Sequence, residues 1–274
     1  SFSTAPCMEL SHIILLALVQ AITEFLPVSS SGHLGLIGFL LGWDYQGVTF
    51  DLALHFGTLI AVLAYYRRDL AGIATAMLTR DRSEHGRTQH RLGIGLALGI
   101  IPAAIVGASM GEETAATLRV PALIAVNLIA FGILLGIADR ASGKTRGITS
   151  VTIKEALLIG AAQALALIPG TSRSGITMTA GLFLGLDRHE AARYSFLMGV
   201  PITAAACAHG ALELYKSGEA IIWADFALGA AVAAIGGIAC IHFLLHFLRR
   251  LGLMPFVWYR IVLGLVVLGL VYLR

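Results

Sequence analysis

The sequence predicts an all-α polytopic membrane protein with six full transmembrane helices and two re-entrant helical hairpins in an inverted-topology repeat. The first observation is composition: 57% of the 274 residues are hydrophobic, 13% are charged and the mean hydropathy is +0.84, whereas about 25% of the residues of soluble domains are charged. The second is a repeated break: Gln20 to Gly32 reads QAITEFLPVSSSG, and Gln163 to Gly175 reads QALALIPGTSRSG. Helices broken inside a membrane usually mark a ligand site.

Apolar length defines the elements, because a transmembrane helix needs about 20 mainly apolar residues. Two further apolar regions, Leu10 to Trp43 and Lys154 to Leu186, are interrupted near their middles by Pro and hydroxyl residues. Each arm is too short to span, so we predict a re-entrant hairpin in each region, with two short crossings per region as the alternative. The six predicted crossings are Phe50 to Tyr66, Leu92 to Met110, Pro121 to Ala138, Tyr194 to Leu212, Trp223 to Leu248 and Pro255 to Leu273.

The chain is predicted to be a single integral-membrane domain covering 1–274, because the apolar stretches follow one another without a long polar linker. The repeat halves are expected at about 8–140 and 151–274. Residues 1–7 precede Met8, which would serve as an initiator, so we expect them to be a vector-derived remnant. The net charge of +3 is small, so membrane lipids are the expected partners and nucleic acid is not. Three scattered cysteines do not make a disulfide framework or a thiolate metal site.

Basic residues set the orientation, since cytoplasmic connections carry an excess of Lys and Arg. The segment 67–91 is therefore expected inside, because it holds Arg67, Arg68, Arg80, Arg82, Arg87 and Arg91. Counting crossings from there also brings the connection 139–154, with Lys144, and the pair at 249–250 inside, and it places 111–120, with Glu112 and Glu113, outside. Only Arg119 and Lys216 remain on the outer face.

The same count of crossings predicts that the second hairpin is inverted relative to the first. Three crossings separate the two hairpins, so the first is expected to enter from outside and the second from inside, as in inverted repeats. Their tips are then predicted to meet near the midplane of the membrane.

Glu24 is the costliest residue of the first hairpin, because a carboxylate at membrane depth tends to be paired, hydrated or metal-bound. Gln20 lies four residues earlier on the same helical face. Two oxygen donors suit Mg²⁺ or Ca²⁺, with substrate phosphates completing the shell. The alternative is that Glu24 forms a structural ion pair with Arg173.

The tip of the first hairpin carries Ser29, Ser30 and Ser31 before Gly32 and His33. Hydroxyls and backbone N–H groups at a helix start favour an anion. An imidazole close to a serine can act as its base or as an acid toward a leaving group. The alternatives are an ordinary helix cap for the serines and a backbone hydrogen bond for His33.

The tip of the second hairpin reads PGTSRSGIT from Pro169 to Thr177. Arg173 offers a fork for bidentate phosphate binding, and Ser172, Ser174 and Thr177 can donate to the remaining oxygens. The segment lacks the Lys and the spacing of a P-loop, which argues against ATP chemistry. Elsewhere, Asp51 and His55 share a helical face near the outer start of a span, where they either rim an entrance or satisfy each other.

These motifs resemble those of the integral-membrane undecaprenyl pyrophosphate phosphatases of bacteria, also called bacitracin-resistance proteins. The resemblance rests on Gln20 to Glu24 with Pro27 to His33, and on Pro169 to Thr177, and the span arrangement fits over essentially the whole chain. The family pattern allows Glu or Gln at its first acidic position, so Gln20 lies within it.

The resemblance implies hydrolysis of undecaprenyl pyrophosphate to undecaprenyl phosphate, which recycles the lipid carrier of cell-wall synthesis and confers bacitracin resistance. It also implies Mg²⁺ or Ca²⁺, a place in the cytoplasmic membrane, and a site open to its outer side. A homodimer is a further expectation.

Two mechanisms and two other functions stay open at this point. Ser30 is predicted to attack phosphorus with help from His33, or a metal-bound water attacks directly. An inverted-repeat transporter or lipid flippase would also bind an anionic headgroup at the midplane. A non-catalytic scaffold leaves the costly polar residues Glu24, Ser30, His33 and Arg173 unexplained.

Overall fold

The computed structural model describes residues 8–43, 47–79, 81, 83–110, 117–118, 120–141, 143, 145–218 and 220–273. Residues 1–7 lie outside this part of the chain, as do Arg80, Arg82, Glu112, Glu113, Arg119 and Lys144. The predictions that involve these residues therefore concern positions outside the described ranges.

Six helical segments of the described chain are long and apolar enough to cross a membrane, which confirms a multi-pass α-helical membrane protein. Large apolar side chains cover their outer surfaces, and Ile235 and Leu265, for example, are exposed by 72% and 58%. Such a surface suits a lipid environment rather than water. The segments are α3 (Val48–Tyr65), α5 with α6 (Glu84–Gly99 and Ile101–Ser109), α8 (Pro121–Arg140), α11 (Arg188–Ser217), α12 (Trp223–Leu248) and α13 (Met254–Leu273).

The structure corrects one predicted element and adds another. The stretch Leu92 to Met110 is not one continuous helix, because α5 ends at Gly99 and α6 begins at Ile101, just before Pro102. A proline lacks the N–H of the helical ladder, which explains the break. The basic segment after α3, for which the sequence predicted only the cytoplasmic side, contains helices: α4 (Arg67–Thr79) is helical, and α5 already starts at Glu84, capped by the Ser83 hydroxyl.

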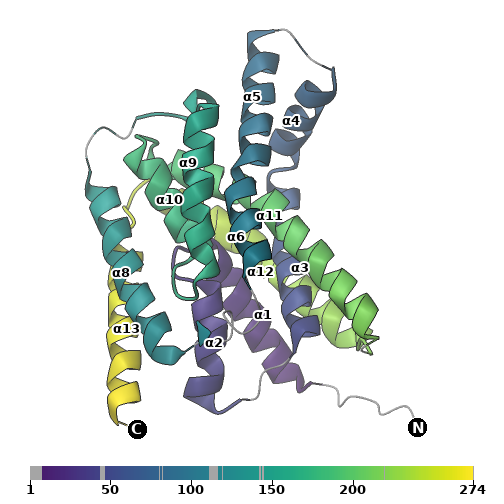
Figure 1. Cartoon of the computed structure of the whole chain (residues 1–274), viewed down its shortest axis with the longest axis vertical. Helices are drawn as coiled ribbons and strands as arrows, with labels where there is room; N and C mark the ends of the chain where they lie inside the picture. Colours follow the sequence, from purple (N-terminus) through teal and green to yellow (C-terminus); the bar gives the residue numbers. More distant parts are fainter. Residues whose placement is uncertain are drawn as a thin grey trace.

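The two interrupted regions form the expected helical hairpins. The first consists of α1 (Leu10–Phe25) and α2 (Ser30–Leu41), and the second of α9 (Ile153–Ala164), the short 3₁₀ turn η2 (Leu165–Leu167) and α10 (Arg173–Phe183). The arms have 16, 12, 12 and 11 residues, fewer than the about 20 needed to cross a bilayer. Figure 1 shows α1 and α2 approaching from the end at which α13 finishes, and α9 and α10 from the opposite end.

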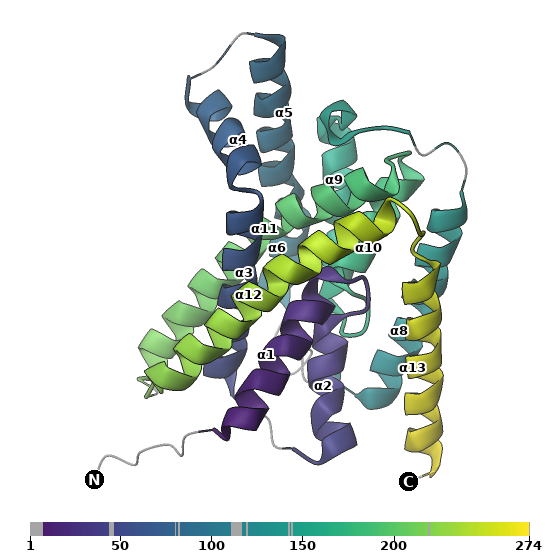
Figure 2. The same cartoon turned by 180° about the vertical axis from the view of Figure 1, so that it is seen from behind.

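The remaining helices hold the hairpins in place. Figure 2 shows α12 running across α1 and α3, while α13 lies along α8. Glycines allow close helix approach, since a Cβ at Gly57 of α3 would lie 2.3 Å from the carbonyl oxygen of Ala230 in α12, and one at Gly160 of α9 would lie 2.1 Å from that of Gly99. Small residues at helix interfaces are the usual means of packing inside membranes.

Candidate active site

The two hairpin tips share one local structure. Ser29 and Ser172 have φ of 77° and 75°, the two positive values of non-glycine residues in the described chain. Each serine hydroxyl accepts a hydrogen bond from the N–H three residues later, Gly32 at 3.2 Å and Gly175 at 3.1 Å. Side chains at positive φ are uncommon, and the caps offset part of their strain. Both breaks therefore start their second helix in the same way.

A buried arginine joins the two tips. The guanidinium of Arg260 in α13 is fully buried and donates to the carbonyl oxygen of Pro27 in the first tip and to those of Gly170 and Thr171 in the second. It also donates to the carbonyl of Leu128 in α8. Five donors in a rigid fork suit such a bridge between unpaired carbonyls. No motif in the sequence pointed to Arg260, because its partners are backbone atoms far along the chain.

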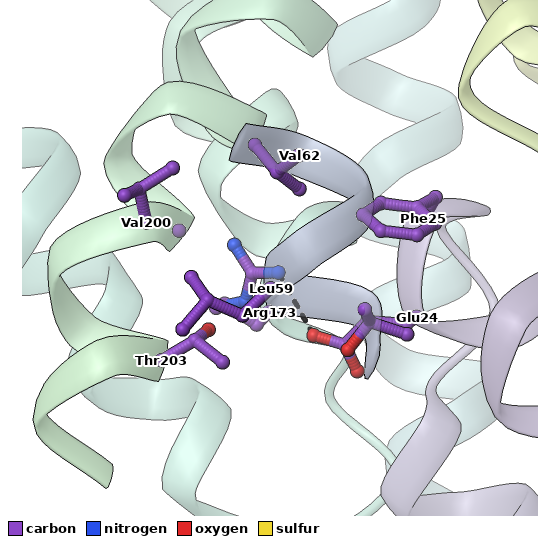
Figure 3. Close-up of a pocket in the computed structure, with 9 residues that line it drawn as sticks. Glu24, Phe25, Leu59, Val62, Arg173, Val200 and Thr203 are labelled. Carbon is purple, nitrogen blue, oxygen red and sulfur yellow. Dashed lines mark hydrogen bonds and ion pairs between the residues drawn. The ribbon is translucent and has the colours of Figure 1, made fainter. Parts of the chain in front are cut away.

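Glu24 lies at the centre of the meeting point. Its Oε1 accepts a hydrogen bond from Nη2 of Arg173 at 2.8 Å, and its Oε2 accepts one from the Ser30 hydroxyl at 2.6 Å. Figure 3 shows the ion pair against the apolar side chains of Phe25, Leu59, Val62 and Val200. An ion pair shielded from water is stronger than one at the surface, although its burial costs desolvation.

The Arg173 guanidinium fits against α11 because residue 199 of that helix is a glycine. A Cβ at Gly199 of α11 would lie 2.0 Å from Nη1 of Arg173. The same Nη1 donates to the carbonyl of Ser195 at 3.3 Å. Helix α11 therefore both receives and orients the guanidinium, a role for Gly199 that the sequence analysis did not identify.

A cavity of about 240 Å³ opens beside these groups. Its polar lining comes from both hairpins, α3 and Thr203 of α11, and its apolar lining comes from α6, η2 and α11. The lining residues are Thr23, Glu24, Ser30, Ser31, His55, Ala103, Gln163, Ala166, Leu167, Ser172, Arg173, Ile202, Thr203 and Ala206. A cavity lined by both charged and apolar residues suits a ligand that carries an anionic head on a hydrocarbon chain.

The other predicted phosphate-binding hydroxyls divide into two groups. Ser31 and Ser172 line the cavity. Ser29, Ser174 and Thr177 do not, and their hydroxyls bond within the protein: Ser174 donates to the carbonyl of Leu26 at 3.1 Å, and Thr177 to that of Arg173 at 2.8 Å. In this arrangement the second group supports the tips rather than facing the cavity.

His33 is bound on both sides of its ring. Its Nδ1 donates to the carbonyl of Ser29 at 2.7 Å, which leaves Nε2 to accept from the hydroxyl of Tyr259 at 2.7 Å. The two rings are nearly parallel, with centroids 5.6 Å apart. No hydrogen bond between His33 and Ser30 is present among the described residues, and the Ser30 proton points instead to Glu24. The predicted catalytic role of His33 stays a prediction.

A second imidazole faces the cavity. His55 of α3 lines it together with Glu24 and Ser30, and its Nδ1 donates to the backbone carbonyl of Asp51 at 2.8 Å. That bond fixes the ring and leaves Nε2 for a ligand. The sequence had already indicated a rim position for His55, whereas its closeness to Glu24 depends on how α3 packs against α1.

The donors at this site suit a hard divalent cation. Glu24 supplies a carboxylate, and Gln20 supplies a buried Oε1 that has no hydrogen-bond partner while its Nε2 donates to Glu24 at 3.3 Å. No cluster of three or more His, Cys, Asp or Glu side chains occurs in the described ranges. Mg²⁺ commonly takes one or two protein oxygens together with substrate phosphates. The residues thus fit such an ion, provided that a Glu24 oxygen gives up one of its present hydrogen bonds and binds the ion instead.

Comparisons with known proteins identify the family of this chain. The family model described as bacitracin resistance protein BacA matches residues 13–266. The chain is 47% identical to an undecaprenyl-diphosphatase of Hahella chejuensis, with 92% of this chain and 95% of the relative covered. It is 46% identical to one of Nitrosococcus oceani, with 94% and 97% covered, and 47% identical to undecaprenyl-diphosphatase 2 of Stutzerimonas stutzeri, with 96% and 98% covered. The chain therefore belongs to the bacitracin resistance protein BacA family.

Proposed function

We propose that this protein is an undecaprenyl-diphosphatase, which hydrolyses undecaprenyl pyrophosphate to undecaprenyl phosphate and inorganic phosphate. The observation that carries the proposal is the meeting of Glu24, Ser30 and Arg173 at one cavity, in a chain whose relatives carry that name. A cell that recycles its lipid carrier in this way would resist bacitracin, in keeping with the name of the family.

Ser30 is the proposed nucleophile and Glu24 its proposed base. The Ser30 hydroxyl already donates to Oε2 of Glu24 at 2.6 Å, so the proton passes to the carboxylate as Oγ attacks the terminal phosphorus. The bond from that phosphorus to the bridging oxygen breaks, and undecaprenyl phosphate leaves with the bonding electron pair. Water then hydrolyses the phosphoserine, which releases phosphate and restores the hydroxyl.

Arg173 is proposed to bind the terminal phosphoryl group. Its two terminal nitrogens now bind Glu24 and the carbonyl of Ser195, and a phosphate would compete for the same fork. The hydroxyl of Ser172 lies on the same wall of the cavity. A bound Mg²⁺ or Ca²⁺, held by Glu24 and Gln20, would neutralise negative charge on the pyrophosphate.

The cytoplasmic, or inner, membrane of a bacterium is the proposed location, with the site open to its outer side. The support is the basic segment that joins α3 to α5, which the positive-inside rule assigns to the cytoplasm. Helix α4 of this segment lies at the end of the molecule opposite to the end of α13. A homodimer stays a prediction.

Release of inorganic phosphate from a purified sample tests the proposal. We expect turnover of a polyprenyl pyrophosphate that depends on a divalent cation and stops on chelation. No release across several cations and detergents would favour the transporter alternative. Rapid quenching should trap phosphate on Ser30 in the wild type, whereas full turnover by Ser30→Ala would favour direct attack by water.

A further inference from the structure

Gln163 is a buried amide with nothing to bind. Only 2% of the residue is exposed, and neither Nε2 nor Oε1 has a hydrogen-bond partner among the residues that the structure describes. Most buried polar atoms in native proteins are paired, because an unpaired one carries the full cost of its lost hydration. The repeat-related Gln20 differs, since its Nε2 donates to Glu24. A group that the fold leaves unpaired inside a cavity wall is a candidate for a ligand contact.

Gln163 lines the cavity beside apolar residues. Residues 163, 166 and 167 all line the cavity, and their spacing of three and four places them on one face of the chain as α9 passes into η2. Ser172 and Arg173 follow in the same lining. The Gln163 amide therefore adds a polar group next to the hydrocarbon-like part of the cavity that Ala166 and Leu167 form.

We infer that Gln163 binds the lipid-side phosphate of a prenyl pyrophosphate. The inference rests on the proposed function. If Ser30 and Arg173 engage the terminal phosphorus, the other phosphate must lie where the ligand turns from charge to hydrocarbon. An amide suits that position because Nε2 donates to a phosphoryl oxygen without adding a charge that would hold back the departing monophosphate.

The leaving group also explains why an uncharged donor is needed. After the bridging bond breaks, this phosphate carries the new negative charge and must still leave the site with its prenyl chain. An arginine there would bind the product about as well as the substrate, and equal binding of both does not speed turnover.

Binding measurements separate this inference from the proposed function. Gln163→Met keeps the length of the side chain but removes both polar atoms. We expect a prenyl monophosphate to bind about tenfold more weakly, as for the loss of one hydrogen bond to a charged group. Binding of inorganic phosphate should change less than twofold, because the terminal-phosphate residues remain. Equal affinity of wild type and variant for the prenyl monophosphate would overturn the inference, even if the wild type hydrolyses pyrophosphates.

The chain offers a matched control. Gln89 of α5 is a half-buried glutamine whose Oε1 also lacks a partner, and it does not line the cavity. Gln89→Met should leave the affinity for prenyl monophosphate within twofold of the wild type. An equal loss in both variants would overturn the inference.

Turnover and thermal stability provide the second readout. We expect Gln163→Met to raise KM for a prenyl pyrophosphate about tenfold. Its Tm should not fall below that of the wild type, because the substitution removes an unpaired amide. Gln163→Glu, which adds a negative charge of the same shape, should raise KM further. A wild-type KM in both variants would refute the lipid-side contact, whereas a wild-type protein with no turnover would refute only the proposed function.

Discussion

The two hairpins have the same backbone conformation at the serine that starts the second helix, but they supply different chemistry. In both, a serine at positive φ caps the helix that follows the break. The next residue is Ser30 in the first hairpin and Arg173 in the second. Both of these residues reach the same carboxylate, at 2.6 Å and 2.8 Å. The comparison teaches that two similar helix breaks bring corresponding positions together, and that the different residues at those positions make the site.

A second difference lies before the break. Counting four residues from the shared glutamine gives Glu24 in the first hairpin and Leu167 in the second. Helix α1 continues to Phe25, whereas the second hairpin tightens into the 3₁₀ turn η2. The first hairpin therefore contributes the acid and the hydroxyl, and the second contributes the cation and part of the apolar wall.

Exchanging the charges between the hairpins should have the largest effect. We expect Glu24→Gln or Arg173→Ala to lower kcat/KM by about 10³-fold or more, because each removes a group that acts on the reacting phosphate. The double variant Glu24→Arg with Arg173→Glu restores an ion pair and should recover part of the Tm, but not the activity. Phosphate release and thermal unfolding measure the two effects. Activity within tenfold of wild type in the double variant would show that the pair is structural.

Substitutions of His33 and His55 should differ in their effects on thermal stability. His55→Ala is expected to lower kcat about 10²-fold, the size expected if the ring that lines the cavity beside Ser30 protonates the departing phosphate, while Tm changes little. His33→Ala should lower activity together with Tm, by about 2–4 °C for the loss of about 1 kcal/mol, because it loosens the first tip. Tyr259→Phe should reproduce part of the His33 loss. A large kcat effect for His33→Ala at wild-type Tm would instead assign the acid–base role to His33.

The capping serines test how far the two tips are equivalent. Ser29→Ala and Ser172→Ala should each destabilise the protein by about 1 kcal/mol, the usual loss for a helix cap. Only Ser172 lines the cavity, so only Ser172→Ala should also raise KM, by about tenfold. Thermal unfolding and steady-state kinetics report the two quantities. Unequal losses of stability would mean that the shared backbone does not reflect a shared role.

The smallest predicted effect is on the pH dependence of Tm, and it concerns the start of α9, the first helix of the second hairpin. Thr152 and Glu155 form a capping box at the start of α9, whereas Glu9, the N-cap residue of α1, makes no side-chain cap. The hydrogen bond from Arg146 lowers the pKa of Glu155 from 4.5 to about 2. The stabilisation is therefore complete above about pH 4.5 and is lost as the pH falls toward 2. Glu155→Gln should flatten this part of the profile of Tm against pH, and an unchanged profile would contradict the contribution of the pair.

Much of the fold could be predicted because it depends on local properties of the chain. Apolar length gave the six crossings, and the proline and hydroxyl runs gave the two breaks. The break at Ile100 was missed because Pro102 lies inside an otherwise continuous apolar run. The helix α4 was not predicted, because its basic start indicated only the side of the membrane on which the segment lies.

The site was only partly predictable. Glu24, Ser30 and Arg173 were expected and do meet, since a buried acid and a buried arginine need each other. Gln163 was recognised only as part of a motif, because a sequence does not show which amide finds a partner. Gly199 and Arg260 carried no signal, since one acts through an absent side chain and the other through distant carbonyl oxygens.

The sequence by itself determined that the chain crosses a membrane and breaks two helices, because helix length, proline and hydropathy act over a few residues. Tertiary structure alone decided that Ser30 donates to Glu24 while His33 binds Tyr259, and that His55 faces the cavity. The contact between His33 and Tyr259 joins helices far apart in the chain, whereas Ser30 and Glu24 lie on either side of one helix break. The distances in these contacts follow from how α3, α11 and α13 pack around the hairpins, which no local pattern of residues encodes.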